Sequence, residues 1–181
     1  MRNVLVVACA ALLGACAGQP TGTPVTVRMD APGAWTATPA DSLVEVKVKD
    51  TRASRGGTRQ AAFGVDMGDI VFDPPEARIV KVRLEQALNR LLKQKGVTQR
   101  QTVECDLKEF TAGTDTTPVY WDVVGRISVV LRDNGRELPL SSSATERTYV
   151  WPGETIIRKV MEESMRQLLD QLDKKSGELL G

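Results

Sequence analysis

Alternation of apolar and charged residues predicts most of the strands in this chain. In the segment 43–50, three valines face one way and charged side chains face the other, which indicates a half-buried strand. The same alternation predicts three further strands, over 102–110, 119–133 and 136–151. Between the last two, Asn134 and Gly135 tolerate the positive φ values of a tight turn, so we expect a hairpin there.

Two longer segments carry apolar residues at the three- and four-residue spacing of amphipathic helices. The first, 73–96, has Asp73 and Glu76 at the positions of a capping box, prolines between them, and Gly96 as a stop signal. The second helix is expected over 152–175. Its apolar stripe consists of Ile157, Val160, Met161, Ser164, Met165, Leu168 and Leu172.

The order of these elements predicts an α+β fold. We expect a two-layer sandwich in which about four strands form a mixed sheet and two amphipathic helices cover one face. The first helix would connect two parallel neighbours, and the remaining strands would form a meander. Gly125 lies on the apolar face of its strand, where it leaves room for a helix or marks a bulge. The stretch 51–69 shows no sustained period, so we expect a long loop.

The N-terminal residues have the pattern of a lipoprotein export signal. Arg2 precedes an apolar run of about ten residues, too short to span a bilayer, and the sequence LGAC at 13–16 resembles a bacterial lipobox. In a lipobox the cysteine thiol takes a diacylglycerol, so Cys16 is the expected lipidation site and membrane anchor. The alternative is an ordinary cleaved signal beside an incidental Cys16. By the sorting rules that go with this resemblance, Ala17 favours the outer membrane, with the domain facing the periplasm.

These interpretations divide the chain into four parts. They are a signal peptide at 1–15, a lipidated flexible tether at 16–42, one α+β domain at 43–175 and a C-terminal tail at 176–181. The tether is rich in Pro, Gly, Thr and Ala and carries little apolar surface to bury. Within it, Val25 and Val27 alternate as they would in a short early strand.

Charge and cysteine content narrow the range of partners. The chain has 24 basic and 23 acidic residues, and removal of 1–15, which contains the single charged residue Arg2, leaves the two in balance. We therefore expect no nucleic-acid partner.

The three cysteines have different expected fates. Cys9 leaves with the signal peptide and Cys16 is acylated. Cys105 then has no disulfide partner and is expected to be a buried apolar residue.

The sequence contains no histidine, which excludes Ser–His–Asp and Cys–His catalysis, histidine metal sites and histidine pH switching. It also lacks the glycine-rich motifs that cradle phosphates. We therefore expect no enzymatic activity, no catalytic residue, no cofactor and no metal. A hydrolase that uses two carboxylates, drawn from Asp66, Asp69 and Asp115, is the least favoured interpretation.

The segment that follows the first strand carries the candidate site residues. Asp50 and Arg52 lie two residues apart, so their side chains point the same way and can form an ion pair. With Arg55, Gly56 and Gly57 they form a candidate site that either binds a ligand or organises the loop. A basic run lies in the same part of the chain and consists of Lys47, Lys49, Arg52, Arg55 and Arg59. It either binds lipid head groups or anionic glycan, or it forms a solvated strand face.

Several of these features together resemble the YajG-type periplasmic lipoproteins. They are the lipobox, the sequence VEVKVKDTRASRGG at 44–57, the proline-started helix, and the meander followed by a last helix. The resemblance covers most of the mature chain and implies the fold and the location. Members of that family have no established activity. In architecture alone, the plan is also similar to the lipopolysaccharide-assembly lipoprotein and to lipoprotein activators of peptidoglycan synthases.

The function we expect is that of a non-catalytic, lipid-anchored accessory module that binds another envelope protein. Pairing of a partner strand with a free sheet edge is the favoured mode. The alternative is a carrier or sensor for peptidoglycan or lipopolysaccharide fragments. A carrier needs a concave apolar pocket under 51–72, whereas a scaffold is solid beneath it.

Overall fold

The computed structural model describes residues 22–29 and 42–180. Their elements are β1 (Val25–Arg28), β2 (Val44–Asp50), β3 (Gly57–Gln60), η1 (Ala62–Gly64, a single 3₁₀ turn), β4 (Asp66–Asp73), α1 (Glu76–Gln94), β5 (Gln101–Thr116), β6 (Trp121–Asp133), β7 (Arg136–Thr148) and α2 (Glu154–Leu180). The expected signal peptide, Cys16 and much of the expected tether lie outside the described residues.

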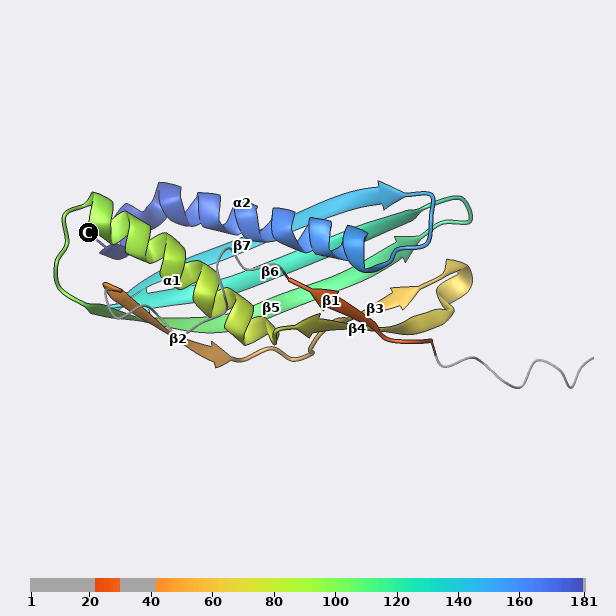
Figure 1. Ribbon diagram of the computed structural model, residues 1–181, viewed down its shortest axis with the longest axis horizontal. Coiled ribbons are helices and arrows are strands. Elements are labelled where there is room, and N and C mark those ends of the chain that lie inside the picture. The colour runs from red at the N-terminus through yellow and green to blue at the C-terminus, as the bar shows by residue number, and fades with distance from the viewer. Residues whose placement is uncertain (1–21, 30–41, 181) are drawn as a thin grey trace, which may run out of the picture.

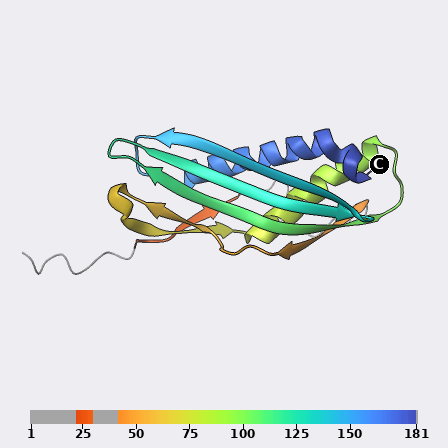
Figure 2. The same ribbon diagram turned by 180° about the vertical axis from the view of Figure 1, so that it is seen from behind.

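The larger sheet has four strands in the order β2-β5-β6-β7. α1 connects β2 to a parallel neighbour, β5, and β5, β6 and β7 form an antiparallel meander. Asn134 and Gly135, with φ values of 48° and 79°, make the turn between β6 and β7. Both helices lie on one face of this sheet (Figure 1), and the view from behind shows the strands uncovered (Figure 2). The predicted α+β class and its layers are confirmed.

A second sheet, of three strands in the order β1-β4-β3, lies where the sequence suggested a loop. The prediction of a long loop over 51–69 is therefore wrong for β3 and β4. The inward positions of β4 are Gly68, Ile70 and Phe72, so a glycine interrupts the apolar alternation and weakens the strand pattern.

β1 lies within the range expected for the tether, 16–42, and pairs in parallel with β4. Val27 is fully buried, so this strand belongs to the core and the folded part begins before residue 43. The short early strand that Val27 and Val25 indicated is present. A four-residue strand of this kind depends on its partners for stability, and composition alone therefore describes it poorly.

β5 joins the two sheets, because it pairs with β6 along most of its length and also lies beside both β2 and β3. β2 pairs with the first half, and β3 runs beside the second half. The backbones approach so closely that a Cβ on Gly57 would lie 1.6 Å from the carbonyl oxygen of Ala112. Phe72 of β4 meets Phe110 of β5 edge to face, with ring centroids 5.0 Å apart. One continuous core therefore serves both sheets.

The N-terminus of α1 has no side-chain cap, whereas its C-terminus ends at a glycine. Its N-cap residue is Pro75 without a side-chain capping bond, and Asp73 is the last residue of β4, so the predicted capping box is wrong. At the other end Gly96 takes a φ of 71°, and the N–H of Val97 donates to the carbonyl of Leu92. This left-handed stop is the one that the sequence predicts.

α2 packs over β6 and β7 of the main sheet and is longer than predicted. It continues to Leu180, so the expected tail 176–181 is helical up to that residue. Gly125 of β6 leaves room for this helix: a Cβ there would lie 2.8 Å from Met161 Sδ, and Ser164 Oγ donates to the Gly125 carbonyl at 3.0 Å. Cys105 is buried as expected, and burial raises the pKa of its thiol to about 12.

Candidate functional site

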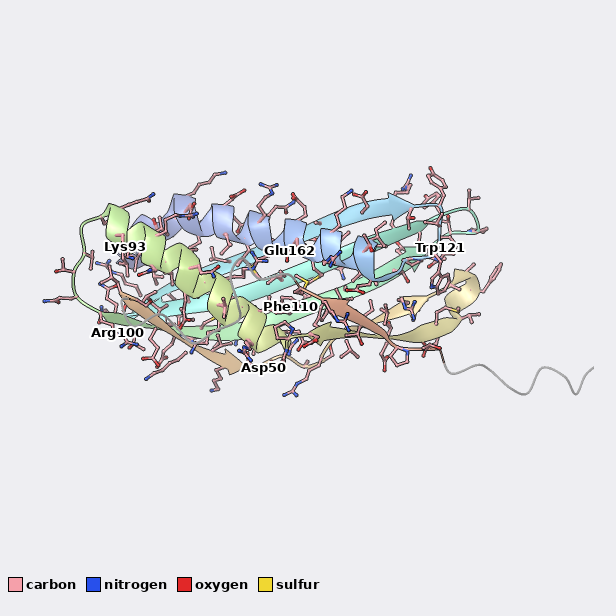
Figure 3. All side chains as sticks on the ribbon, in the orientation of Figure 1. Asp50, Lys93, Arg100, Phe110, Trp121 and Glu162 are labelled. Carbon is pink, nitrogen blue, oxygen red and sulfur yellow. The ribbon has the colours of Figure 1, made fainter. Side chains whose placement is uncertain are left out.

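Asp50 and Arg52 form the ion pair that their spacing indicates. Arg52 Nε and Nη2 donate to the two carboxylate oxygens of Asp50, each at 2.8 Å. Two parallel bonds of this kind fix the guanidinium as well as attract it. The Arg52 side chain is only 2 % exposed, so water does little to weaken the pair. Figure 3 places Asp50 at the end of β2, near the first turn of α1.

Glu76, in the first turn of α1, extends this pair into a network. Arg52 Nη1 lies 3.3 Å from Glu76 Oε1, and the N–H of Gly56 donates to the same oxygen at 3.2 Å. Arg52 Nη1 also donates to the carbonyl of Phe110 at 3.4 Å. One buried guanidinium therefore connects β2, α1 and β5. The sequence interpretation missed this role of Glu76 because it assigned the carboxylate to helix capping.

The network shifts the pKa values of two of its members. Hydrogen bonds from Arg52 lower the pKa of Asp50 from 3.8 to about 2. The Asp50 carboxylate, with a further contribution from Glu76, raises the pKa of Arg52 above its ordinary value. Asp50 and Arg52 therefore keep their charges throughout the neutral pH range. Their contacts tie the loop to α1 and β5, as the loop-organising interpretation predicts; both roles that the sequence left open stay predictions.

The two glycines of the candidate site satisfy packing requirements. Gly56 has a φ of 65°, and a Cβ on it would lie 2.4 Å from the carbonyl oxygen of Ile70. Gly57 lies against β5, as described above. Together with Arg55, these glycines line a hollow of about 510 Å³ beside β4 and the start of α1. Three of the five predicted residues therefore line one hollow, and Glu76 links it to the Asp50–Arg52 pair.

The charges around this hollow do not favour an anionic ligand. Its lining contains one guanidinium, that of Arg55, and two carboxylates, those of Asp69 and Glu76. Arg55 is 79 % exposed, and its Nε already lies 3.6 Å from Asp50 Oδ2. Six of the ten residues that line the hollow are polar or charged, whereas a carrier's pocket is lined mainly by apolar side chains.

The expected basic run does not form one surface. Lys47 and Lys49 are exposed on the uncovered face of the main sheet, whereas Arg52 is buried in its ion pair. Arg59 turns inward, where its Nη2 donates to the carbonyls of Thr23 and Met67, and burial lowers its pKa. A continuous cationic patch for head groups or anionic glycan is therefore not present at these positions.

A groove between β7 and α2 is a candidate surface that sequence reasoning did not locate. It has a volume of about 600 Å³ and is lined by 144–146 of β7, by one side of α2 and by Arg83 of α1. A second hollow of about 450 Å³ continues it towards the start of α2. Glu146 and Lys159 line both, and Lys159 Nζ lies 2.6 Å from Glu146 Oε1. We call this surface the β7–α2 groove.

Two features are absent from residues 22–29 and 42–180, a metal site and a membrane-spanning helix. No group of three or more Cys, Asp or Glu side chains is arranged to hold a metal ion there. In the same part of the chain, no helix combines the length and the apolar character needed to cross a membrane.

Comparison with solved structures gives several distant likenesses. No family model and no curated protein matches the chain. A solved structure described only as an uncharacterized protein is 10 % identical, with a TM-score of 0.39, over 86 % of this chain and 94 % of its own. Lipoprotein GNA1162 from Neisseria meningitidis is 13 % identical, with a TM-score of 0.26, over 65 % of this chain and 94 % of its own. At such TM-scores the likenesses carry no argument about function.

Proposed function

We propose that this protein is a non-catalytic lipoprotein of the bacterial outer membrane that binds an extended segment of another envelope protein along the edge of β7. The lipobox that ends at Cys16 supports the anchor. The binding mode rests on one observation: among the described residues, β7 is a 13-residue strand at the end of its sheet and pairs only with β6. An unpaired strand edge offers backbone groups to a partner strand.

Only part of this edge is open. Pro139 has no N–H to donate, and Gln171 Nε2 of α2 donates to the carbonyl of Ser141 at 2.7 Å. These two features protect the first half of β7 against unwanted pairing. The second half, 142–148, contains no proline, and part of the second half of β7 emerges from behind α2 in Figure 1, so we take 142–148 as the open part. A partner strand of ordinary length fits such a segment.

The β7–α2 groove lies beside this open segment and would bind side chains of the partner strand. Val160, Met165 and Leu169 give the groove an apolar part, and the pair Glu146–Lys159 gives it a charged part. In strand addition the backbone bonds supply much of the affinity, and pockets for alternate side chains supply specificity. The groove and the edge together therefore suit a peptide segment better than a small ligand.

A carrier or sensor of peptidoglycan or lipopolysaccharide fragments is the second candidate. The hollow beside Arg55 is the place where such a fragment would bind. Its excess of carboxylates weakens this candidate, because both kinds of fragment carry negative charge.

Photo-crosslinking in living cells separates the two functions. A photoreactive phenylalanine analogue replaces Thr145 in the β7–α2 groove or Arg55 in the hollow. The same analogue at Gln99, an exposed position at the far end near Arg100 (Figure 3), is the control. We expect a discrete protein adduct from position 145 and none from position 99. Glycan or lipid adducts from position 55, without a protein adduct from position 145, would contradict the proposal.

A further inference from the structure

One end of the molecule carries most of the exposed large apolar side chains. Seven such residues occur in the described part of the chain, and six belong to three loops at the end where η1 lies (Figure 1). The six are Phe63, Val65, Val119, Tyr149, Val150 and Trp151. We call the three loops, 61–65, 117–120 and 149–153, the apolar end.

The three loops lie together although they are far apart in sequence. Trp121 meets Trp151 with ring centroids 5.7 Å apart, and Tyr120 meets Tyr149 at 6.2 Å. The guanidinium of Arg59, just before the first loop, lies 5.6 Å from the centre of the Trp151 ring. None of the three loop sequences, AAFGV, TPVY and YVWPG, contains a charged residue. Soluble proteins rarely expose so many large apolar side chains at one end without a binding role.

Phe63 is the clearest member of this group. Its side chain is 97 % exposed, and its backbone has a φ of 66°, a conformation that bulky residues rarely adopt. It therefore contributes almost nothing to the core, while its ring stays in contact with water. The hydrophobic effect stabilises such a residue only when a partner or a membrane outside the domain covers its side chain.

The chain enters the domain at this same end. Gly22 lies against the backbone of Met67 and Gly68, directly after the loop that holds Phe63, and Arg59 Nη2 bonds the carbonyl of Thr23. Cys16 precedes Gly22 by six residues, and an extended chain covers at most about 3.6 Å per residue. An acylated Cys16 would therefore hold the apolar end within roughly 20 Å of the membrane surface.

We propose that the apolar end inserts its exposed side chains into the lipid interface beside the acylated Cys16; this rests on the lipid anchor of the proposed function. Trp and Tyr prefer the boundary between head groups and acyl chains, and Phe and Val prefer the apolar side of it. The lipid anchor keeps the loops at a high local concentration beside the membrane, so the loops need little affinity of their own for lipid. The long axis of the domain then points away from the membrane. The part of the β7–α2 groove lined by 144–146 and by α2 stays open to the periplasm, whereas the second hollow, lined in part by Val150 and Trp151, lies at the membrane.

An environment-sensitive dye on the full acylated chain tests this inference. Phe63→Cys carries the dye in one loop and Val119→Cys in a second, while Gln99→Cys carries it at the far end. Mass spectrometry first establishes acylation of Cys16. The acylated chain is then placed on protein-free vesicles of phosphatidylethanolamine with a minority of phosphatidylglycerol. We expect emission at shorter wavelength, and quenching by brominated acyl chains, at positions 63 and 119 but not at 99.

The outcomes separate the inference from the proposed function. An acylated chain whose dyes at positions 63 and 119 behave like the dye at 99 overturns the insertion and leaves the anchor intact. A shift seen in native envelope membranes but absent from the protein-free vesicles also overturns it, because the loops then meet a protein. A chain without fatty acid on Cys16 overturns both.

Discussion

Gly125 shows how a single residue decides where a helix can lie. It occupies the apolar face of β6 and has an ordinary strand conformation, so its importance comes from space rather than from backbone freedom. Val160, Met161 and Ser164 of α2 surround the place that a side chain would fill. The sequence indicated that this glycine either leaves room for a helix or marks a bulge, and the contacts of α2 support the first explanation.

Gly125→Ala should therefore destabilise the protein. The added Cβ must displace α2 or force side chains from their rotamers, which costs about 1–3 kcal/mol. Gly113→Ala is the matched control on the neighbouring strand, because its Cβ would meet only Thr58 O at 3.8 Å. Chemical denaturation of both variants measures the difference. Equal stability of the two would contradict the account of how α2 packs.

Asp50 links the loop network to the pH dependence of stability. Its pKa is about 2 in the folded protein and ordinarily 3.8, so folding favours the ionised carboxylate. The resulting stabilisation is present above pH 3.8 and is lost as the pH falls towards 2. Its size is about 2 kcal/mol.

Asp50→Asn should lower the free energy of unfolding at pH 7 and flatten its decline between about pH 4 and 2. Asp115→Asn, at an exposed position of β5, is the control. Urea denaturation at a series of pH values makes the comparison. A decline as steep as that of the parent protein would show that Asp50 is not the group responsible.

At the scale of elements, the strong patterns gave reliable predictions and the weak ones did not. The main sheet, its parallel β2–β5 pair and both helices follow from long amphipathic segments, in which many residues support one assignment. β1 and β3 have four residues each, and the inward positions of β3 and β4 include Arg59 and Gly68. They form strands because β5 and the core hold them, and no local pattern reports that tertiary contact.

The candidate site likewise has one part that the sequence predicts and another that it does not. The Asp50–Arg52 pair depends on a spacing of two residues at a strand end, which sequence can supply. Glu76 and Arg59 depend on where distant elements meet, as does the β7–α2 groove. Residue types at these positions have several ordinary explanations, so only the assembled fold distinguishes among them.

β1 provides the sharpest test at the scale of elements. Val27→Asp places a charge at a fully buried position beside β4, and we expect a loss of at least about 3 kcal/mol. Thr26→Asp, on the exposed side of the same strand, should have little effect. Thermal unfolding of the two variants measures the contrast. Similar melting temperatures would show that residues 25–28 act as the flexible tether that composition suggested.

At the scale of the whole molecule, the proposed functions occupy adjoining regions, which share Val150 and Trp151. The apolar end and the entry of the chain lie together at one end, and the α1–β5 connection lies at the other (Figures 1 and 3). The open half of β7 and its groove lie along the side between them. A domain held at its apolar end would therefore present this groove to partners at a fixed distance from the membrane.

The anchor at Cys16 is the central claim, and the intact mass of the native protein tests it most directly. The chain extracted from cell membranes should begin at Cys16 and carry a diacylglyceryl group on its thiol and a further acyl chain on its new N-terminus. Partition into the detergent phase should accompany that mass. A mature chain without fatty acid, or an uncleaved chain of 181 residues recovered from the cytosol, would contradict the account.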